Sequence, residues 1–136
     1  MERRDFLKQC GALCLSSVGM AATLQSCKTL YVPNETVNNR ILVKKADFQQ
    51  GNFVLIRNNR LQAPLYLRKE TDDKYTAVLM LCTHKGCELN TAGDRLVCPC
   101  HGSEFSHTGQ VLSPPADKDL RPYAVTSDTN TIYIQL

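Results

Sequence analysis

The feature that most constrains this chain is a pair of short loops rich in cysteine and histidine. The first loop reads C-T-H-K-G-C over residues 82–87, and the second reads C-P-C-H-G-S over residues 98–103. Together they contain four of the seven cysteines and two of the three histidines in the chain. Thiolate sulfur and imidazole nitrogen are ligands that soft and borderline transition metals prefer. Core packing explains such a concentration poorly, so the sequence predicts a metal centre between the two loops.

One cysteine and one histidine from each loop form the candidate ligand set. Cys82-x-His84 is followed, after thirteen residues, by Cys98-x-x-His101. Two cysteines and two histidines can hold a structural zinc ion tetrahedrally. The same four side chains can hold a 2Fe–2S cluster, with two thiolates on one iron and two imidazoles on the other. The ligand spacing alone leaves both alternatives open.

The other residues of the loops favour the iron–sulfur alternative. Each loop has a further cysteine, Cys87 in the first and Cys100 in the second, that a four-ligand zinc site does not use. Gly86 and Gly102 allow positive φ and a close approach of the backbone to a bulky cluster. Pro99 stiffens the second loop and removes an N–H donor that would otherwise need a partner. We therefore expect a 2Fe–2S cluster rather than zinc.

These two loops resemble those of the Rieske iron–sulfur protein family. The resemblance continues through E-F-S-H-T-G-Q-V-L-S-P-P-A at residues 104–116, whose proline pair would begin a third loop over the cluster. It covers roughly residue 38 to the C-terminus. It implies that Cys82 and Cys98 ligate a buried iron and that His84 and His101 ligate the outer iron of a 2Fe–2S cluster.

The resemblance also implies roles for other residues of the loops. Cys87 and Cys100 would form a disulfide that ties the two loops together. Ser103 corresponds to a serine whose hydroxyl donates to a cluster sulfide, an interaction that raises the reduction potential. Phe105 stands where quinol-oxidising members carry a tyrosine, so one hydroxyl donor is missing. We predict a potential below theirs, in the middle of the range of about −150 to +300 mV for such centres.

Two further side chains near the loops bear on partners and ligands. Lys85 occupies the tip of the first loop, where members that dock into an apolar quinol pocket usually carry leucine or another apolar residue. Because a lysine is costly to bury without a partner, it favours a soluble acidic redox partner. His107, the third histidine, lies in a turn-like stretch and is expected to be exposed rather than to ligate metal.

The implied function is one-electron transfer, sometimes with a proton, without the making or breaking of substrate bonds. The potential should fall as pH rises, because each ligand imidazole keeps an N–H that can be lost on oxidation. Three settings fit: a stand-alone lipoprotein shuttle, the Rieske subunit of a quinol–cytochrome c oxidoreductase, or the small subunit of a molybdenum enzyme such as arsenite oxidase. Lys85, Phe105 and a weak membrane anchor favour the first and third. Whether the protein is part of an enzyme stays open.

Two other classes were weighed. A ring-hydroxylating oxygenase needs a further iron site with two histidines and a carboxylate. His107 is the single histidine after the second loop, so this chain alone cannot be one. Ferredoxins that serve such oxygenases typically lack the second cysteine pair. The alternative outside electron transfer is a zinc-stabilised surface lipoprotein that binds a partner protein, which metal content would separate from the rest.

The N-terminus predicts an export signal over residues 1–26. Its R-R-D-F-L-K start resembles a twin-arginine signal, the route for proteins that cross the membrane already folded around a cofactor. A basic-start signal for unfolded export is the alternative. The uncharged stretch over residues 9–26 is marginal as a membrane span. It ends in L-Q-S-C, which resembles a lipoprotein processing site with Cys27 as the lipidated residue, the alternative being an uncleaved anchor.

These assignments account for every cysteine and place the protein outside the cytoplasm. Cys10 and Cys14 lie in the signal, Cys27 carries lipid, and the other four form the ligand and disulfide pairs. A disulfide agrees with an oxidising location. We expect an exported protein tethered to a membrane on the periplasmic side or the cell surface. Removing three basic and two acidic residues with the signal lowers the net charge from +3 to about +2, too little to indicate nucleic-acid binding.

The remainder of the chain predicts an all-β domain over residues 40–136 that follows a polar tether over residues 27–39. Strand-like runs separated by turn residues cover 40–45, 52–57, 63–68 and 74–81, and a hairpin covers 123–136. No sustained helical periodicity occurs outside the signal. The expected fold is a small antiparallel β-barrel or sandwich, with a cluster-binding loop subdomain at about residues 82–113.

Overall fold

The computed structural model describes residues 31–49 and 51–136, which form twelve β-strands and one 3₁₀ turn. The predicted export signal and Cys27 lie outside the described residues. Within them no helix is long and apolar enough to cross a membrane. The elements are β1 (Glu35–Val37), β2 (Arg40–Lys44), the 3₁₀ turn (Lys45–Asp47), β3 (Phe53–Ile56), β4 (Leu65–Lys69), β5 (Tyr75–Leu79), β6 (Asn90–Ala92), β7 (Arg95–Val97), β8 (Glu104–Ser106), β9 (Val111–Ser113), β10 (Pro122–Tyr123), β11 (Val125–Ser127) and β12 (Thr131–Gln135). The all-β prediction is confirmed.

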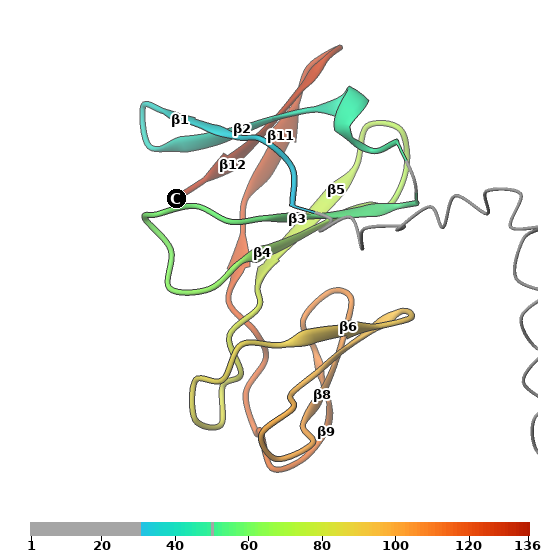
Figure 1. Cartoon of the computed structure of the whole chain (residues 1–136). Helices are drawn as coiled ribbons and strands as arrows, with labels where there is room; N and C mark the ends of the chain where they lie inside the picture. The colour runs from blue at the N-terminus through green and yellow to red at the C-terminus, as the bar shows by residue number, and fades with distance from the viewer. Residues whose placement is uncertain (1–30, 50) are drawn as a thin grey trace, which may run out of the picture.

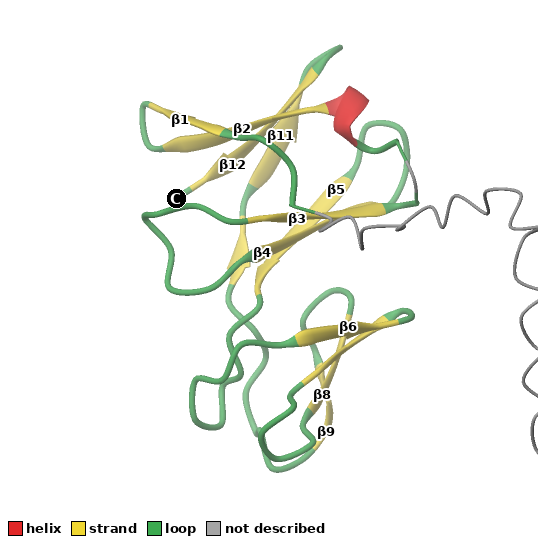
Figure 2. Ribbon diagram, viewed as in Figure 1, coloured by secondary structure: helices red, strands yellow, loops and turns green. Residues whose placement is uncertain are grey.

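The strands form three antiparallel sheets of four strands each. Two of them, with orders β1-β2-β12-β11 and β10-β5-β4-β3, make up the body of the domain. The third sheet, with order β6-β7-β8-β9, lies beyond the end of the body with the loops around it, in the lower half of Figure 1. Figure 2 shows that most of the chain around this third sheet is loop rather than strand. This third sheet and its loops are the predicted cluster-binding subdomain.

Strands β4 and β5 separate two hydrophobic cores. Leu65 and Leu67 on β4 belong to a core shared with the inward-facing residues of β2 and β12. Tyr66, between them, belongs to a second core that continues into the third sheet, and Val78 on β5 joins it there. Successive side chains of a strand point to opposite faces, so both faces of β4 and β5 are buried. This explains why their sequences are continuous apolar runs rather than alternating ones.

The second core joins the body of the domain to the cluster-binding subdomain. Leu96 on β7 and Phe105 on β8 are almost fully buried in it, and the two strands pair with these residues opposite each other. Cys82 and Cys98 belong to the same core. The chain that leaves β5 therefore passes from the first core into the second, where the first ligand loop begins at Cys82.

The strands expected over the body are present, whereas those of the third sheet were not anticipated. The predicted hairpin is formed by β11 and β12. In its turn, the Asp128 carboxylate accepts backbone N–H bonds from Asn130 and Thr131 at 2.9 and 2.8 Å. Strands β6 to β9 have only three residues each, which is too short for side-chain alternation to identify them.

The described part of the predicted tether is folded against the domain. Tyr31 forms a parallel bridge with Leu55, and β1 pairs with β2. The Asn58 side chain donates to Asn34 Oδ1 and Thr36 Oγ1, each at 2.9 Å. The polar side chains that indicated a solvated tether here bind a neighbouring loop. From Tyr31 onward this segment is therefore part of the domain, whose start lies earlier than the expected residue 40.

Candidate metal centre

The first ligand loop is closed by two backbone hydrogen bonds. The Cys82 N–H donates to the Cys87 carbonyl at 2.8 Å, and the Gly86 N–H donates to the Cys82 carbonyl at 2.8 Å. Gly86 adopts a φ of 75°, a conformation that favours glycine. The expected positive φ is confirmed. The backbone conformation alone explains the glycine, because there is space for a side chain: an added Cβ would meet no protein atom within 4 Å.

The second loop repeats the same closure. The Cys98 N–H donates to the Ser103 carbonyl at 2.8 Å, and the Gly102 N–H donates to the Cys98 carbonyl at 3.0 Å. Gly102 has a φ of 80°. Each loop thus begins with a buried cysteine and turns through a glycine at the fifth position. The two loops present their first sulfur atoms from equivalent backbone positions, although their histidines stand one position apart.

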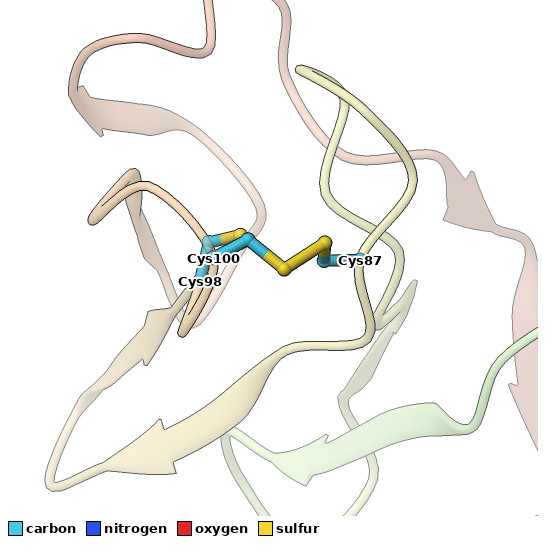
Figure 3. Close-up of side chains that lie close together, drawn as sticks. All are labelled: Cys87, Cys98 and Cys100. Atoms are coloured by element: carbon cyan, nitrogen blue, oxygen red, sulfur yellow. A yellow bond between two sulfur atoms is a disulfide. The ribbon is translucent and has the colours of Figure 1, made fainter.

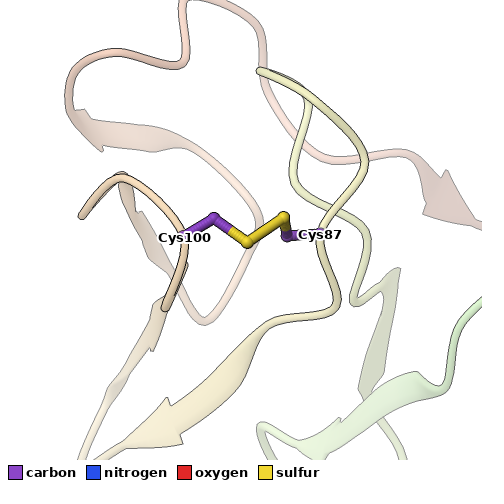
Figure 4. The surroundings of a disulfide bond; sticks show 2 residues. All are labelled: Cys87 and Cys100. Carbon is purple, nitrogen blue, oxygen red and sulfur yellow. A yellow bond between two sulfur atoms is a disulfide. The ribbon is translucent and has the colours of Figure 1, made fainter.

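A disulfide joins the two loops. Cys87 and Cys100 form it, with a sequence separation of 13, as the resemblance implied (Figure 4). The sulfur atoms of Cys87, Cys98 and Cys100 all lie within 4.8 Å of one another (Figure 3). Since the disulfide sulfurs provide no thiolate, Cys98 is the one member of this group that is able to ligate a metal through a thiolate.

The remaining two cysteines of the loops are free and lie close together. Cys82 and Cys98 are 3% and 2% exposed, and both belong to the second core. Burial raises the pKa of Cys98, but the backbone N–H of Cys100, the Cys82 side chain and the backbone N–H of His101 lower it. The net effect is a pKa below the ordinary value. The same N–H groups would stabilise a metal-bound thiolate.

The two loop histidines face each other, but neither they nor Cys82 belong to the group of ligand atoms within 4.8 Å of one another that includes the Cys98 sulfur. The ring centroids of His84 and His101 lie 4.9 Å apart, with an angle of 86° between the rings. His101 is exposed and His84 is half-buried. The Nδ1 atom of His84 is buried and has no hydrogen-bond partner. An unpaired buried nitrogen is unfavourable, and binding to a metal would satisfy it. The donor set of two thiols and two imidazoles therefore fits a 2Fe–2S cluster.

The third loop is fixed to both ligand loops by hydrogen bonds. Ser103 is fully buried, and its Oγ accepts the Ala116 N–H at 2.9 Å. Thr83 Oγ1 donates to the Lys118 carbonyl at 2.7 Å. Because the Ser103 oxygen serves as acceptor, its own hydrogen remains available for donation. The sequence indicated a third loop from its prolines, but nothing in it marked Thr83 or Ala116 as the points of attachment.

Replacement of Ser103 by alanine is expected to loosen this attachment and lower the reduction potential. The Ala116 N–H would lose its acceptor in a buried position, which costs about 1–3 kcal/mol of unfolding free energy. Loss of a hydroxyl donor beside the cluster stabilises the oxidised state relative to the reduced one. Chemical denaturation and a redox titration of the holoprotein measure the two effects. An unchanged potential would mean that the Ser103 hydroxyl does not reach the cluster.

The other residues that the sequence analysis singled out, Phe105, Lys85 and His107, are not candidate ligands. Phe105 is fully buried in the second core, and Lys85 is exposed at the tip of the first loop. His107 lies in the turn between β8 and β9, apart from the candidate ligands. It is less exposed than expected, because its Nε2 lies 3.6 Å from Glu70 Oε1 and its side chain is 31% exposed.

The fold and the residues of this site fit an iron–sulfur protein with mixed cysteine and histidine ligands. A model of the Rieske [2Fe-2S] domain matches residues 38–124. The chain belongs to the Rieske family and is built around an electron-transfer domain that carries a 2Fe–2S cluster.

Individual relatives and solved structures agree with this assignment. The cytochrome b6-f complex iron-sulfur subunit of Prochlorococcus marinus (strain MIT 9303) is 33% identical over 75 residues, which are 52% of this chain and 42% of the relative. The corresponding subunit of Chlorobaculum tepidum is 35% identical over 63 residues, 45% of this chain and 35% of the relative. This chain thus spans less than half the length of these curated relatives.

A solved structure matches over more of the fold. The crystal structure of the cyanobacterial plasma membrane Rieske protein PetC3 from Synechocystis PCC 6803 is 33% identical. The match has a TM-score of 0.59 and covers 74% of this chain and 100% of that chain. Most of the fold is therefore shared with a protein of the same family.

Proposed function

We propose that this protein is an exported, membrane-tethered carrier of single electrons, with Cys82, His84, Cys98 and His101 as its cluster ligands. The observation that carries the proposal is a set of two buried free thiols and two facing imidazoles, one of which has a buried and unpaired Nδ1. The disulfide-linked loops hold these four side chains together. Iron–sulfur chemistry supplies one-electron reduction and reoxidation at such a site.

Each residue of the site has a separate task in this proposal. The buried thiols of Cys82 and Cys98 bind from the side of the second core, where water is excluded. His84 binds through Nδ1, because that atom is buried, and its Nε2 then carries the proton that can be lost. His101 is exposed, so a docked partner can approach the centre from its side.

The partner that we propose is a soluble protein with an acidic docking surface. Lys85 is exposed at the loop tip and makes no ion pair with any described residue. Lys85 directly follows His84 in the chain, so a partner that docks at this loop tip meets the ammonium group. Burying it without a carboxylate would be unfavourable, whereas a facing carboxylate would stabilise the encounter.

Replacement of Lys85 by glutamate is expected to slow electron transfer to small anionic oxidants and to speed it to cationic ones. The change of two charge units at the tip alters the association rate through long-range electrostatics, by about tenfold at low ionic strength. Stopped-flow oxidation by ferricyanide and by hexaammineruthenium(III) measures both rates. Lys74→Glu, in the turn between β4 and β5, is the matched control. Equal effects of the two variants would contradict a docking role for Lys85.

Membership of a larger complex is the second candidate function. It is supported by the relatives, which are subunits of the cytochrome b6-f complex. In this alternative the chain is the Rieske subunit of a quinol–cytochrome c oxidoreductase. The exposed lysine at the tip favours the separate carrier, because an apolar quinol pocket would have to accept its charge.

Replacement of Phe105 by tyrosine is expected to raise the potential. Phe105 is fully buried beside Cys98 in the second core, so an added hydroxyl needs a partner there. A ligand sulfur is the acceptor that would satisfy it, and donation to sulfur stabilises the reduced cluster. A rise of some tens of millivolts in a redox titration is expected. Phe105→Leu is the control without a hydroxyl, and an equal rise in that variant would contradict the explanation.

The experiment that tests the proposed function is an EPR-monitored redox titration of the purified holoprotein at several pH values. A one-electron signal of the reduced protein with the low average g of histidine-ligated iron, and a potential that falls at alkaline pH, are expected. Nernst behaviour with two electrons, or a sample that contains zinc without iron, would overturn the proposal. Mass spectrometry of the mature N-terminus tests whether Cys27 is lipidated.

A further inference from the structure

A small hollow on the body of the domain is lined by two arginines. Its volume is about 190 Å³. Its lining consists of Asn39, Arg60, Leu61, Arg121, Tyr123 and Leu136. These residues come from the β1–β2 turn, the β3–β4 loop, the segment around β10 and the C-terminal end. The hollow shares none of its lining residues with the candidate ligands or the disulfide.

Each of the two guanidinium groups is held by a contact of its own. Arg60 Nη2 donates to Asn39 Oδ1 at 2.9 Å, and Asn39 Nδ2 in turn donates to the Leu136 carbonyl at 2.8 Å. The Arg121 guanidinium lies over the Tyr123 ring, 4.9 Å from its centroid. Holding an arginine in place before a ligand arrives lowers the entropy that binding must overcome.

Neither arginine has a carboxylate partner within the described part of the chain, where ion pairs do form at Arg57, Arg68 and Arg95. Leu136, the last residue of the sequence, also lines the hollow, but no carboxylate lies within 4.0 Å of Arg60 or Arg121 in the described residues. The lining of one small space therefore includes two arginines that have no carboxylate partner among the described residues.

We propose that this hollow, which we call the Arg60–Arg121 site, binds a phosphate group. Guanidinium groups present several N–H donors in a fixed plane that match the oxygens of phosphate in pairs. A phosphate carries enough oxygens to accept from both arginines, which a single carboxylate does less well. Leu61 and Leu136 add apolar residues to the lining.

The position of the site in the chain makes a lipid headgroup one source of that phosphate. Arg57, three residues before Arg60, binds the Tyr31 hydroxyl at 3.0 Å. Tyr31 lies four positions after Cys27, a reach of at most about 14 Å. If Cys27 is lipidated, as the proposed function holds, Tyr31 and the β3–β4 loop that it contacts through Arg57 lie close to the membrane surface. Free phosphate is the other source.

Calorimetric titration of the full-length holoprotein with inorganic phosphate at low ionic strength tests the site. Arg60→Gln and Arg121→Gln are each expected to weaken phosphate binding about tenfold, the loss of a charge-assisted hydrogen-bond pair. Arg121→Lys, which keeps the charge and loses the paired donors, is expected to weaken it several-fold. Lys74→Gln, which removes a distant exposed positive charge, should leave it within about twofold.

Absence of phosphate binding to the wild-type protein, or equal losses in Arg121→Gln and Lys74→Gln, would overturn the proposal. The EPR spectrum of each variant is the independent check on the redox centre. An unchanged spectrum with lost phosphate binding assigns the loss to this site. A wild-type protein that binds phosphate but shows no Rieske-type signal would overturn the proposed function and leave the phosphate site standing.

Flotation with vesicles distinguishes the two sources of phosphate. The full-length protein is compared on phosphatidylcholine vesicles with and without phosphatidylglycerol, so that any contribution of the N-terminal anchor is common to both. Extra binding to the anionic vesicles that disappears in Arg121→Gln and persists in Lys74→Gln supports the headgroup. Calorimetric phosphate binding without such an increment supports free phosphate and overturns the lipid source.

Discussion

Replacement of Cys98 by serine is expected to give a protein that holds almost no iron. The side chain is 2% exposed in the second core and, among the described residues, is the one free thiol that lies within 4.8 Å of both disulfide sulfurs. Its sulfur receives N–H groups from Cys100 and His101, which stabilise a thiolate. A serine hydroxyl ionises far less readily and is a poor ligand for this cluster. Iron analysis should fall from about two atoms per chain to near none, with loss of the reduced-state EPR signal.

The matched control is His107→Gln, which alters a histidine outside the ligand set. This variant should retain its iron, because His107 contacts Glu70 on the body of the domain rather than the ligand loops. Full iron content and an unaltered EPR signal in Cys98→Ser would show that Cys98 is not a ligand. Loss of iron in His107→Gln as well would mean that general destabilisation, rather than ligation, accounts for the result.

The ligand loops were predictable from the sequence because their structure is determined locally. A cysteine at each loop start, a glycine at the fifth position and hydrogen bonds between residues four and five apart are contained within six consecutive positions. The histidine and cysteine chemistry in the same window identifies the centre. Positive φ at Gly86 and Gly102 follows from the same short-range geometry.

Features that depend on distant parts of the chain were not predictable in this way. The Ser103–Ala116 and Thr83–Lys118 hydrogen bonds join residues 13 and 35 positions apart, and the residues involved are common in any loop. The segment from Tyr31 to Asn39 was expected to be a tether because it is polar and contains Pro33, whereas its partner Asn58 lies in a separate loop. In both cases the two hydrogen-bonding residues are far apart in the sequence, and only the folded structure brings them together.

Strands β4 and β5 show an intermediate case. Their apolar runs predicted strands correctly, but a continuous run does not say what covers each face. One face is covered by β2 and β12, and the other by the cluster-binding subdomain. The second core matters for function because it contains Cys82 and Cys98 and excludes water from the inner side of the centre.

Replacement of both Cys87 and Cys100 by serine is expected to destabilise the holoprotein by about 3 kcal/mol. The disulfide closes a segment with a sequence separation of 13, and a cross-link over a loop of this length has about that effect on the unfolded chain. The double variant is required, since either single variant leaves a thiol beside Cys98 that competes for iron or forms a wrong disulfide. Denaturant unfolding followed by circular dichroism measures the loss.

Cluster retention in the double variant separates two roles of the disulfide. The link holds the two ligand loops together at a point beside Cys98, so without it the loops are expected to separate more often and release iron faster (Figure 3). The rate of iron transfer to a chelator is measured for the double variant without denaturant. It is compared with the rate for wild-type protein in enough denaturant to give the same global stability. The rate for the double variant is expected to be several-fold higher. Equal rates in these two samples would mean that the disulfide acts only on the unfolded chain and does not by itself retain the cluster.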